Sequence, residues 1–198
     1  MTFKVGVVIF PGSNCDAETV RLFEHMKIPV QRIWHKDPVP ELDMYILPGG
    51  FSYGDYMRAG ALATYSPVMR EIKKYADDGR KVLGICNGFQ ILCEAKILPG
   101  TLMRNDGNSF YCGWMMIRDH SQNSYYVPLA NKDGKYYVEH DVNIAYQYAQ
   151  FAELGIEIAG VYNDKGNVLG MMPHPERAFE LHHTSDDGIK IINNFINL

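Results

Sequence analysis

The first half of the chain alternates between short, continuous apolar runs and longer segments in which apolar residues recur at helical spacing. The apolar runs predict buried strands at residues 3–10, 30–34, 44–47 and 82–85. The helical pattern predicts helices at residues 16–26, about 67–77 and 89–96. Because continuous apolar strands separated by helices are typical of a parallel sheet covered on both faces, this half predicts an α/β fold.

The second half has a different pattern. Residues 102–118 and 125–138 are rich in aromatic and β-branched side chains, and residues 157–162 and 168–172 predict a further hairpin. These segments indicate an antiparallel section in the C-terminal half, which a helix over residues 187–198 follows. No repeat or linker interrupts the pattern, so we expect a single domain over residues 1–198.

A cysteine stands where the strand predicted at residues 82–85 ends and a helix begins. Cys86 has Gly84 two residues before it and Gly88 two residues after it. This is the spacing of a tight strand-to-helix turn that carries a nucleophile, with cysteine in the place of serine. A helix N-terminus directed at the sulfur favours the thiolate. The alternative is a structural cysteine beside two unrelated glycines, since free cysteine is often buried.

A glycine-rich turn could supply the second part of a site. The strand predicted at residues 44–47 ends at Pro48-Gly49-Gly50, and sites in parallel sheets lie at the carboxyl ends of the strands. A tetrahedral intermediate is best stabilised by preorganised backbone N–H groups. The N–H groups of Gly50 and Asn87 are therefore the candidate oxyanion hole.

The segment His174-Pro175-Glu176 could supply the base and its partner. Residues at i and i+2 of an extended segment point the same way, and Pro175 biases His174 towards an extended conformation. A cysteine nucleophile needs a base, and the base needs an acceptor that orients it. The alternative is a surface loop with incidental charge.

Composition limits the remaining possibilities. The formal net charge is −4 and no run of lysine or arginine is long enough to suggest a polyanion partner, which excludes the usual basic footprint of a nucleic-acid-binding protein. No apolar stretch has the length of a signal peptide or a membrane span, so we expect a cytoplasmic chain. In a reducing compartment the four cysteines should be free thiols. Cys15, Cys93 and Cys112 are interpreted as structural.

Three segments together resemble a known enzyme family. They are Gly84-Ile-Cys86-Asn-Gly88-Phe-Gln90, Pro48-Gly-Gly50 and Pro173-His174-Pro-Glu176. They resemble the class I (triad) glutamine amidotransferases, whose sheet is flavodoxin-like. Within that class, residues 6–16, 48–63 and 168–177 are similar to the glutaminase subunit of phosphoribosylformylglycinamidine synthase.

The resemblance implies a reaction. Cys86 would attack the side-chain amide of glutamine, His174 would transfer protons and Glu176 would orient His174, releasing glutamate and ammonia. Gln90 would help to bind glutamine, although it could equally be a helix-packing residue. The ammonia would pass to a separate ATP-dependent synthetase subunit that converts formylglycinamide ribonucleotide to formylglycinamidine ribonucleotide, with a small third subunit.

The resemblance also bears on cofactors and docking. The chain has no Gly-x-x-x-x-Gly-Lys-Ser/Thr motif, so ATP and Mg²⁺ are expected on the synthetase, and no cofactor or metal is expected here. Tyr53, Tyr56, Met57 and Arg58 could form part of the docking surface, or their loop could pack over the glutamine pocket.

Two departures from the family pattern affect the same face of the molecule. Asn131-Lys132-Asp133-Gly134 stands where the family usually has His-Gly-Glu-Gly, and residues 152–155 replace an Asn-Pro-Asn-Gly turn. Two other functions remain open: a stand-alone cysteine hydrolase or peptidase of the same fold, and a catalytically inert binding or regulatory subunit.

Overall fold

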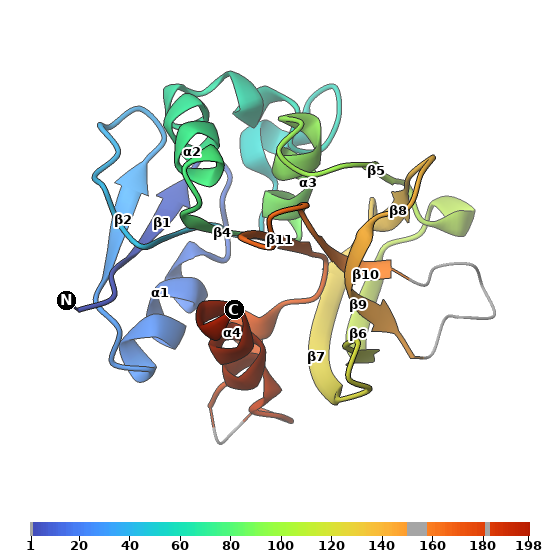
Figure 1. The fold of residues 1–198 in the computed structure, drawn as a ribbon. Helices are drawn as coiled ribbons and strands as arrows, with labels where there is room; N and C mark the ends of the chain where they lie inside the picture. The colour runs from blue at the N-terminus through green and yellow to red at the C-terminus, as the bar shows by residue number, and fades with distance from the viewer. Residues whose placement is uncertain (1, 150–157, 181–182) are drawn as a thin grey trace.

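The computed structural model describes residues 2–149, 158–180 and 183–198, and a nine-stranded sheet forms its centre (Figure 1). The strands are β1 (Val5–Ile9), β2 (Val30–Trp34), β3 (Met44–Leu47), β4 (Lys81–Ile85), β5 (Thr101–Met103), β6 (Tyr111–Arg118), β7 (Ser124–Asn131), β8 (Lys135–Tyr137), β9 (Asn143–Tyr148), β10 (Ile158–Tyr162) and β11 (Val168–Met171). The sheet order is β2-β1-β3-β4-β11-β10-β9-β6-β7, and β5 pairs with β8 separately.

Four α-helices and several short 3₁₀ turns complete the described part of the fold. The helices are α1 (Asp16–His25), α2 (Pro67–Asp77), α3 (Asn87–Glu94) and α4 (Asp187–Asn197). The 3₁₀ turns are η1 (Ser52–Asp55), η2 (Leu62–Tyr65), η3 (Asp106–Asn108) and η5 (Pro175–Arg177). Helices α2 and α3 lie on one face of the sheet, and α1 and α4 lie on the other (Figure 1).

The two halves of the sheet differ in strand direction, as the sequence predicts. Strands β2, β1, β3, β4 and β11 are parallel, and β11, β10, β9, β6 and β7 pair antiparallel. Every residue of β3 and β11 is buried, because helices cover both faces of these central strands. The prediction of an α/β fold with an antiparallel section is confirmed.

Strand β11 joins the two halves. It pairs antiparallel with β10 and parallel with β4, where Met171 lies beside Ile85. The residues that follow β4 and β11 therefore emerge at the same edge of the sheet. The backbone N–H of Cys86 donates to the carbonyl oxygen of Met171 at 2.8 Å, which fixes this junction.

Most elements lie where the hydrophobic pattern places them, with small differences at their ends. The first strand is shorter than predicted, and α3 begins at Asn87, directly after the cysteine. Strand β9 was not predicted. Residue 157 and residues 152–155 lie outside the described ranges. Within those ranges, no helix combines the length and apolarity that crossing a membrane would need.

Candidate active site

Cys86 occupies the tip of a tight turn between β4 and α3. Its backbone has φ 50° and ψ −104°, a conformation that non-glycine residues rarely adopt and that is typical of strained functional positions. A Cβ on Gly88 would lie 1.8 Å from the carbonyl oxygen of Leu47, and one on Gly84 would lie 2.7 Å from the backbone of Gly88. Both glycines are therefore required by the close approach of α3 to the sheet.

Gly88→Ala should consequently destabilise the fold strongly. We expect a loss of about 3 kcal/mol in the free energy of unfolding, because the contact is with backbone that cannot rotate away. The melting temperature should fall by roughly 6–12 °C, measured by circular dichroism. Gly79→Ala is the matched control: its added Cβ meets nothing within 4 Å, so only its positive φ costs energy. Equal losses in the two variants would contradict this account of the turn.

His174 and Glu176 form a buried pair beside this turn. The Nδ1 atom of His174 lies 2.6 Å from Oε1 of Glu176, and their exposed fractions are 2% and 0%. Burial alone would lower the pKa of His174, but the charge of Glu176 and the contacts with Cys86 and Cys15 raise it well above its usual value. The other ring nitrogen, Nε2, has no hydrogen-bond partner among the described residues.

The route to this pairing differs from the sequence prediction. The segment after β11 is not extended, because Pro175–Arg177 forms the 3₁₀ turn η5 and His174 has φ −106° and ψ 84°. The turn, rather than strand alternation, brings the carboxylate to the imidazole. The prediction that the two side chains meet is nevertheless supported by the hydrogen bond between them.

The turn after β3 requires glycine at position 50. Gly50 has φ 147°, and a Cβ there would lie 2.6 Å from the backbone nitrogen of Asn14. Among the described residues, no hydrogen bond uses the backbone N–H of Gly50 or of Asn87. Two unused donors in turns that follow neighbouring strands suit an oxyanion hole, which stays a prediction.

Comparison with known proteins identifies the family. A family model described as a CobB/CobQ-like glutamine amidotransferase domain matches residues 2–151. The chain belongs to the glutamine amidotransferases. It is similar to phosphoribosylformylglycinamidine synthase subunit PurQ of Pyrococcus horikoshii, at 41% identity over 98% of this chain and 97% of the relative.

Two further relatives extend the comparison. The corresponding subunit of Novosphingobium aromaticivorans is 44% identical over 95% of this chain and 94% of its own length. A chain in the solved structure of PurLQS from Thermotoga maritima matches with a TM-score of 0.93 and 36% identity, covering 100% of this chain and 99% of that chain. The similarity therefore extends over the segment that contains His174 and Glu176 as well as the one that contains Cys86.

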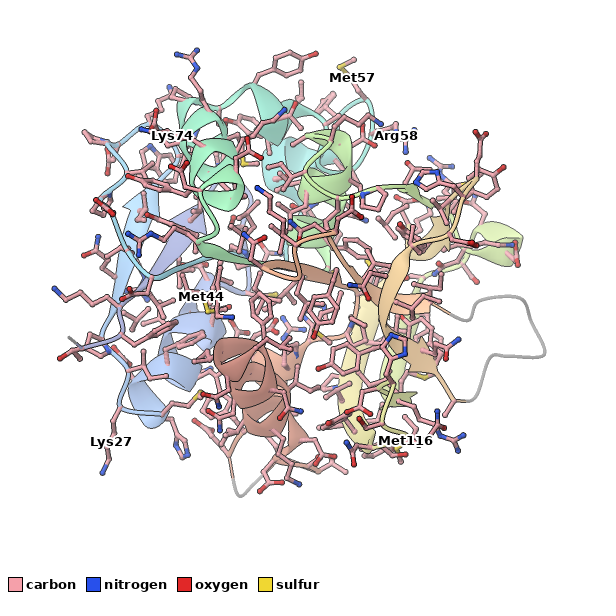
Figure 2. The ribbon with its side chains drawn as sticks, viewed as in Figure 1. Lys27, Met44, Met57, Arg58, Lys74 and Met116 are labelled. Atoms are coloured by element: carbon pink, nitrogen blue, oxygen red, sulfur yellow. The ribbon has the colours of Figure 1, made fainter. Side chains whose placement is uncertain are left out.

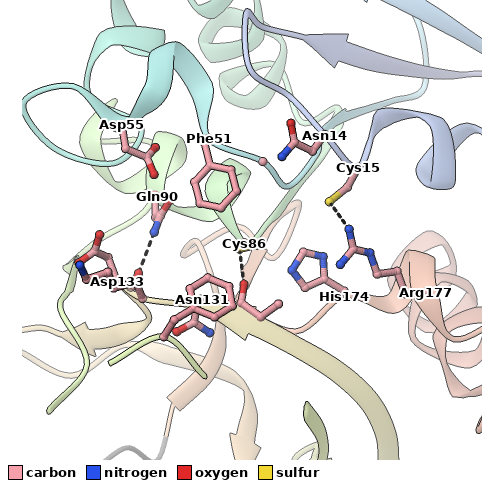
Figure 3. A pocket seen from close by; sticks show the side chains of 14 residues that line it. Asn14, Cys15, Phe51, Asp55, Cys86, Gln90, Asn131, Asp133, His174 and Arg177 are labelled. Carbon is pink, nitrogen blue, oxygen red and sulfur yellow. Dashed lines mark hydrogen bonds between the residues drawn. The ribbon is translucent and has the colours of Figure 1, made fainter. Parts of the chain in front are cut away.

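In this glutamine amidotransferase, one pocket collects the candidate residues. Cys86, Gly50, Gln90 and His174 all line it, and the cysteine thiol donates to the carbonyl oxygen of Ala130 at 3.6 Å (Figure 3). Asn87 does not line this pocket, but it follows Cys86 directly, and its side chain accepts from the backbone N–H of Ser52 and donates to Gln90. Glu176 adjoins the pocket through its hydrogen bond with His174.

Gln90 is held by the protein itself. Its Nε2 donates to the carbonyl oxygen of Asp133 at 2.7 Å, and its Oε1 accepts from Asn87 Nδ2 at 2.9 Å. The first turn of α3 is thereby tied to residues 131–133, which line the pocket and belong to the segment that departs from the usual family pattern. Direct contact between Gln90 and glutamine stays a prediction.

Cys15 is the pocket residue that sequence reasoning misplaced. The sequence predicts a structural loop cysteine, but the Cys15 thiol lines the pocket, lies 3.1 Å from Nη2 of Arg177 and contacts His174. Burial raises the pKa of this thiol. The available signal was its place after β1: the rule that puts sites at the carboxyl ends of parallel strands applies to Cys15 as it does to Cys86.

Cys15, His174 and Glu176 also offer ligand atoms within 4.8 Å of one another, a spacing that a metal ion could use. Two contacts favour the triad interpretation. The Nδ1 atom of His174 is already bound to Glu176, and the guanidinium of Arg177 beside Cys15 would repel a second cation. We therefore retain the prediction that this chain needs no metal.

The sequence leaves two roles open for residues 53–58, docking of a partner and packing against the protein, and the side chains of this loop differ in this respect. Tyr53 turns inward, where its hydroxyl lies 2.8 Å from Ser66 Oγ, and Arg58 forms an ion pair with Glu94 at 3.0 Å. Tyr56 and Met57 are 75% and 84% exposed, and Met57 lies at the outer edge of the molecule (Figure 2). Of the four side chains, these two are the most exposed, which makes them the best candidates to meet a partner.

Proposed function

We propose that this chain is the glutaminase subunit of phosphoribosylformylglycinamidine synthase, hydrolysing glutamine and passing ammonia to a synthetase partner. One observation carries the proposal. A buried His174–Glu176 pair stands beside a cysteine at a strained turn, in a chain similar along nearly its whole length to subunits of that enzyme. The geometry is suited to acyl transfer, and the names of the relatives indicate the enzyme to which the subunit belongs.

The first half of the reaction forms a thioester. The Cys86 thiolate attacks the side-chain amide carbon of glutamine, and the carbonyl oxygen takes the negative charge of the tetrahedral intermediate. The N–H groups of Gly50 and Asn87 stabilise that oxygen. His174 gives a proton from Nε2 to the amide nitrogen, so that the carbon–nitrogen bond breaks and ammonia leaves.

The second half regenerates the Cys86 thiolate. His174, now neutral, takes a proton from water, whose oxygen attacks the thioester carbon. The carbon–sulfur bond breaks, glutamate leaves and the imidazolium again faces the Cys86 thiolate. Glu176 holds Nδ1 throughout, which orients the ring and stabilises its charged form.

The partner follows from the same comparison. The chain works with a synthetase subunit and a small third subunit, which is supported by its similarity to a chain of the PurLQS structure. Formylglycinamide ribonucleotide, ATP and Mg²⁺ bind the synthetase, and this chain uses no cofactor of its own. Tyr56 and Met57 are exposed and belong to the docking surface.

A cytoplasmic location is part of the proposal. All four cysteines are free, and a catalytic thiol has to stay reduced to act as a nucleophile.

Glutamate release in the assembled complex tests the proposal. The chain is mixed with the synthetase and small subunits, and glutamate and formylglycinamidine ribonucleotide are measured with glutamine as the nitrogen source. We expect equal amounts of both products. A complex that makes the nucleotide from ammonia but never from glutamine would support an inert subunit. Cleavage of peptides in place of glutamine would support a stand-alone hydrolase.

A further inference from the structure

The pocket beside Cys86 has ends of opposite character. His174, Cys15 and Arg177 lie on one side of the nucleophile, and two carboxylates, Asp55 and Asp133, lie on the other (Figure 3). The mechanism uses the first end for proton transfer. It gives no role to the acidic end, although both carboxylates line the same cavity as the cysteine.

Asp55 lacks a countercharge. It is half-buried and forms no ion pair within the described ranges, and its only polar side-chain contact there is a long one of 3.4 Å from Asn87 Nδ2. The nearest arginine along the chain, Arg58, pairs with Glu94. Burial, and then the charge of Asp133, raise the pKa of Asp55 to about 6. Such a carboxylate is stabilised by a cation that enters from outside the chain.

Asp133 can assist Asp55 in binding a cation, but it already has a partner of its own. Its carboxylate lies 3.6 Å from Nε of Arg104, whose side chain is 68% exposed. An exposed pair of that length contributes little and leaves most of the carboxylate available. Two acidic groups therefore line one cavity, and the only ion pair that either of them forms among the described residues is the one with Arg104.

Both acids are fixed relative to the nucleophile. Asn87, the residue after Cys86, donates to Asp55 and to Gln90, and Gln90 donates to the backbone of Asp133 at 2.7 Å. The first turn of α3 thus sets the position of the acidic end as well as that of the sulfur. A ligand that spans the pocket would meet both at a defined separation.

The other end of the pocket independently points to a ligand. The Nε2 atom of His174 is buried, has no partner among the described residues and lies in the same cavity. Resting on the proposed function, this atom marks where the amide of glutamine reacts. The short aliphatic chain of glutamine then has to carry its α-amino group away from His174.

We propose that Asp55, assisted by Asp133, binds the α-ammonium group of glutamine and so places the amide carbon at Cys86. The contact selects a free amino acid over an amide that has no charged amine. It also accounts for two carboxylates in a catalytic pocket that share, among the described residues, a single exposed ion pair, the one between Asp133 and Arg104.

Asp55→Asn separates this role from a structural one. In the assembled complex, we expect kcat/KM for glutamine to fall roughly 10–100-fold, mainly through KM, since a hydrogen bond to a charged group is lost. The second substrate is glutaramate, which has hydrogen in place of the α-amino group. Its hydrolysis should be slow in the wild-type complex and unchanged by Asp55→Asn. Asp106→Asn is the control, because Asp106 is exposed and pairs with Lys135 outside the pocket.

The pH dependence of KM gives a second readout. Asp55 loses its charge as the pH falls through about 6, so KM for glutamine should rise below that pH in the wild type and stay flat in Asp55→Asn. The other charged groups at this end are Asp133, Arg104 and Lys132, which all variants keep.

The outcomes are distinguishable. If the wild-type complex releases no glutamate, the proposed function fails. If it releases glutamate but Asp55→Asn slows both substrates equally, or if the wild type hydrolyses glutaramate as well as glutamine, the assignment of the α-ammonium site is overturned. Synthesis from added ammonia should be the same in every variant and reports that the complex is intact.

Discussion

Cys86→Ala should abolish glutamine-dependent synthesis of formylglycinamidine ribonucleotide while leaving synthesis from added ammonia intact. Alanine has no nucleophilic group, so no thioester forms. Glutamine can then react only by direct attack of water on its amide. Removal of the nucleophile from a triad of this kind lowers kcat by roughly 10⁴-fold or more. Both nitrogen sources are compared in the assembled complex by measuring nucleotide product.

The ammonia-dependent rate is the internal control, because it shows that the variant still docks and folds. Cys112→Ala provides a matched control, since this free cysteine is exposed and does not line the pocket. Glutamine-dependent turnover that survives in Cys86→Ala would mean that another group is the nucleophile.

Glu176→Gln should lower glutaminase kcat by about 10³–10⁴-fold. Glutamine keeps the shape of the side chain but removes the charge that orients His174 and stabilises its protonated form. The corresponding exchange of aspartate for asparagine in a serine triad lowers kcat by about 10⁴-fold. Steady-state glutamate release measures it, with Glu180→Gln as a control outside the pocket. A loss of less than tenfold would show that Glu176 does not orient the base.

The same variant should change the pH dependence of stability. The pKa of His174 is raised above its unfolded value of 6.5, so its contribution is fully present below about pH 6.5 and is lost as the pH rises through the folded pKa. Glu176→Gln removes the main cause of that rise. The difference in free energy of unfolding between wild type and variant should therefore be larger at pH 6 than at pH 9, measured by urea denaturation. A difference that does not vary with pH would contradict this linkage.

Local signals allowed much of the fold to be predicted. The turn at Cys86 can be predicted because Gly84 and Gly88 are required by close backbone contacts in the turn itself. Helix α2 was placed within a residue because Pro67 fits the first position of a helix. Strand β9 was missed because Asn143–Tyr148 mixes polar and apolar residues, and its burial is set by its neighbours β10 and β6.

Contacts between distant segments set the rest. The sequence of Val168–Met171 contains no local signal that this strand pairs with β4. This pairing nevertheless places His174 close to Cys86. Cys15 was misplaced for the same reason, since its loop has no nucleophile motif and its partners, His174 and Arg177, lie near the other end of the chain. The His174–Glu176 contact was anticipated, but its backbone conformation was not, because a proline after the histidine permits a 3₁₀ turn as well as a strand.

The insertion of β11 beside β4 also sets the order in which the enzyme becomes active during its own synthesis. The ribosome makes Cys86, the proposed nucleophile directly after β4, well before β11, which leads to His174 and Glu176. At roughly 5–20 residues per second, the segment between them takes on the order of ten seconds to emerge. The nascent chain therefore carries Cys86 without its proposed base, and we expect it to release no ammonia until β11 has joined the sheet.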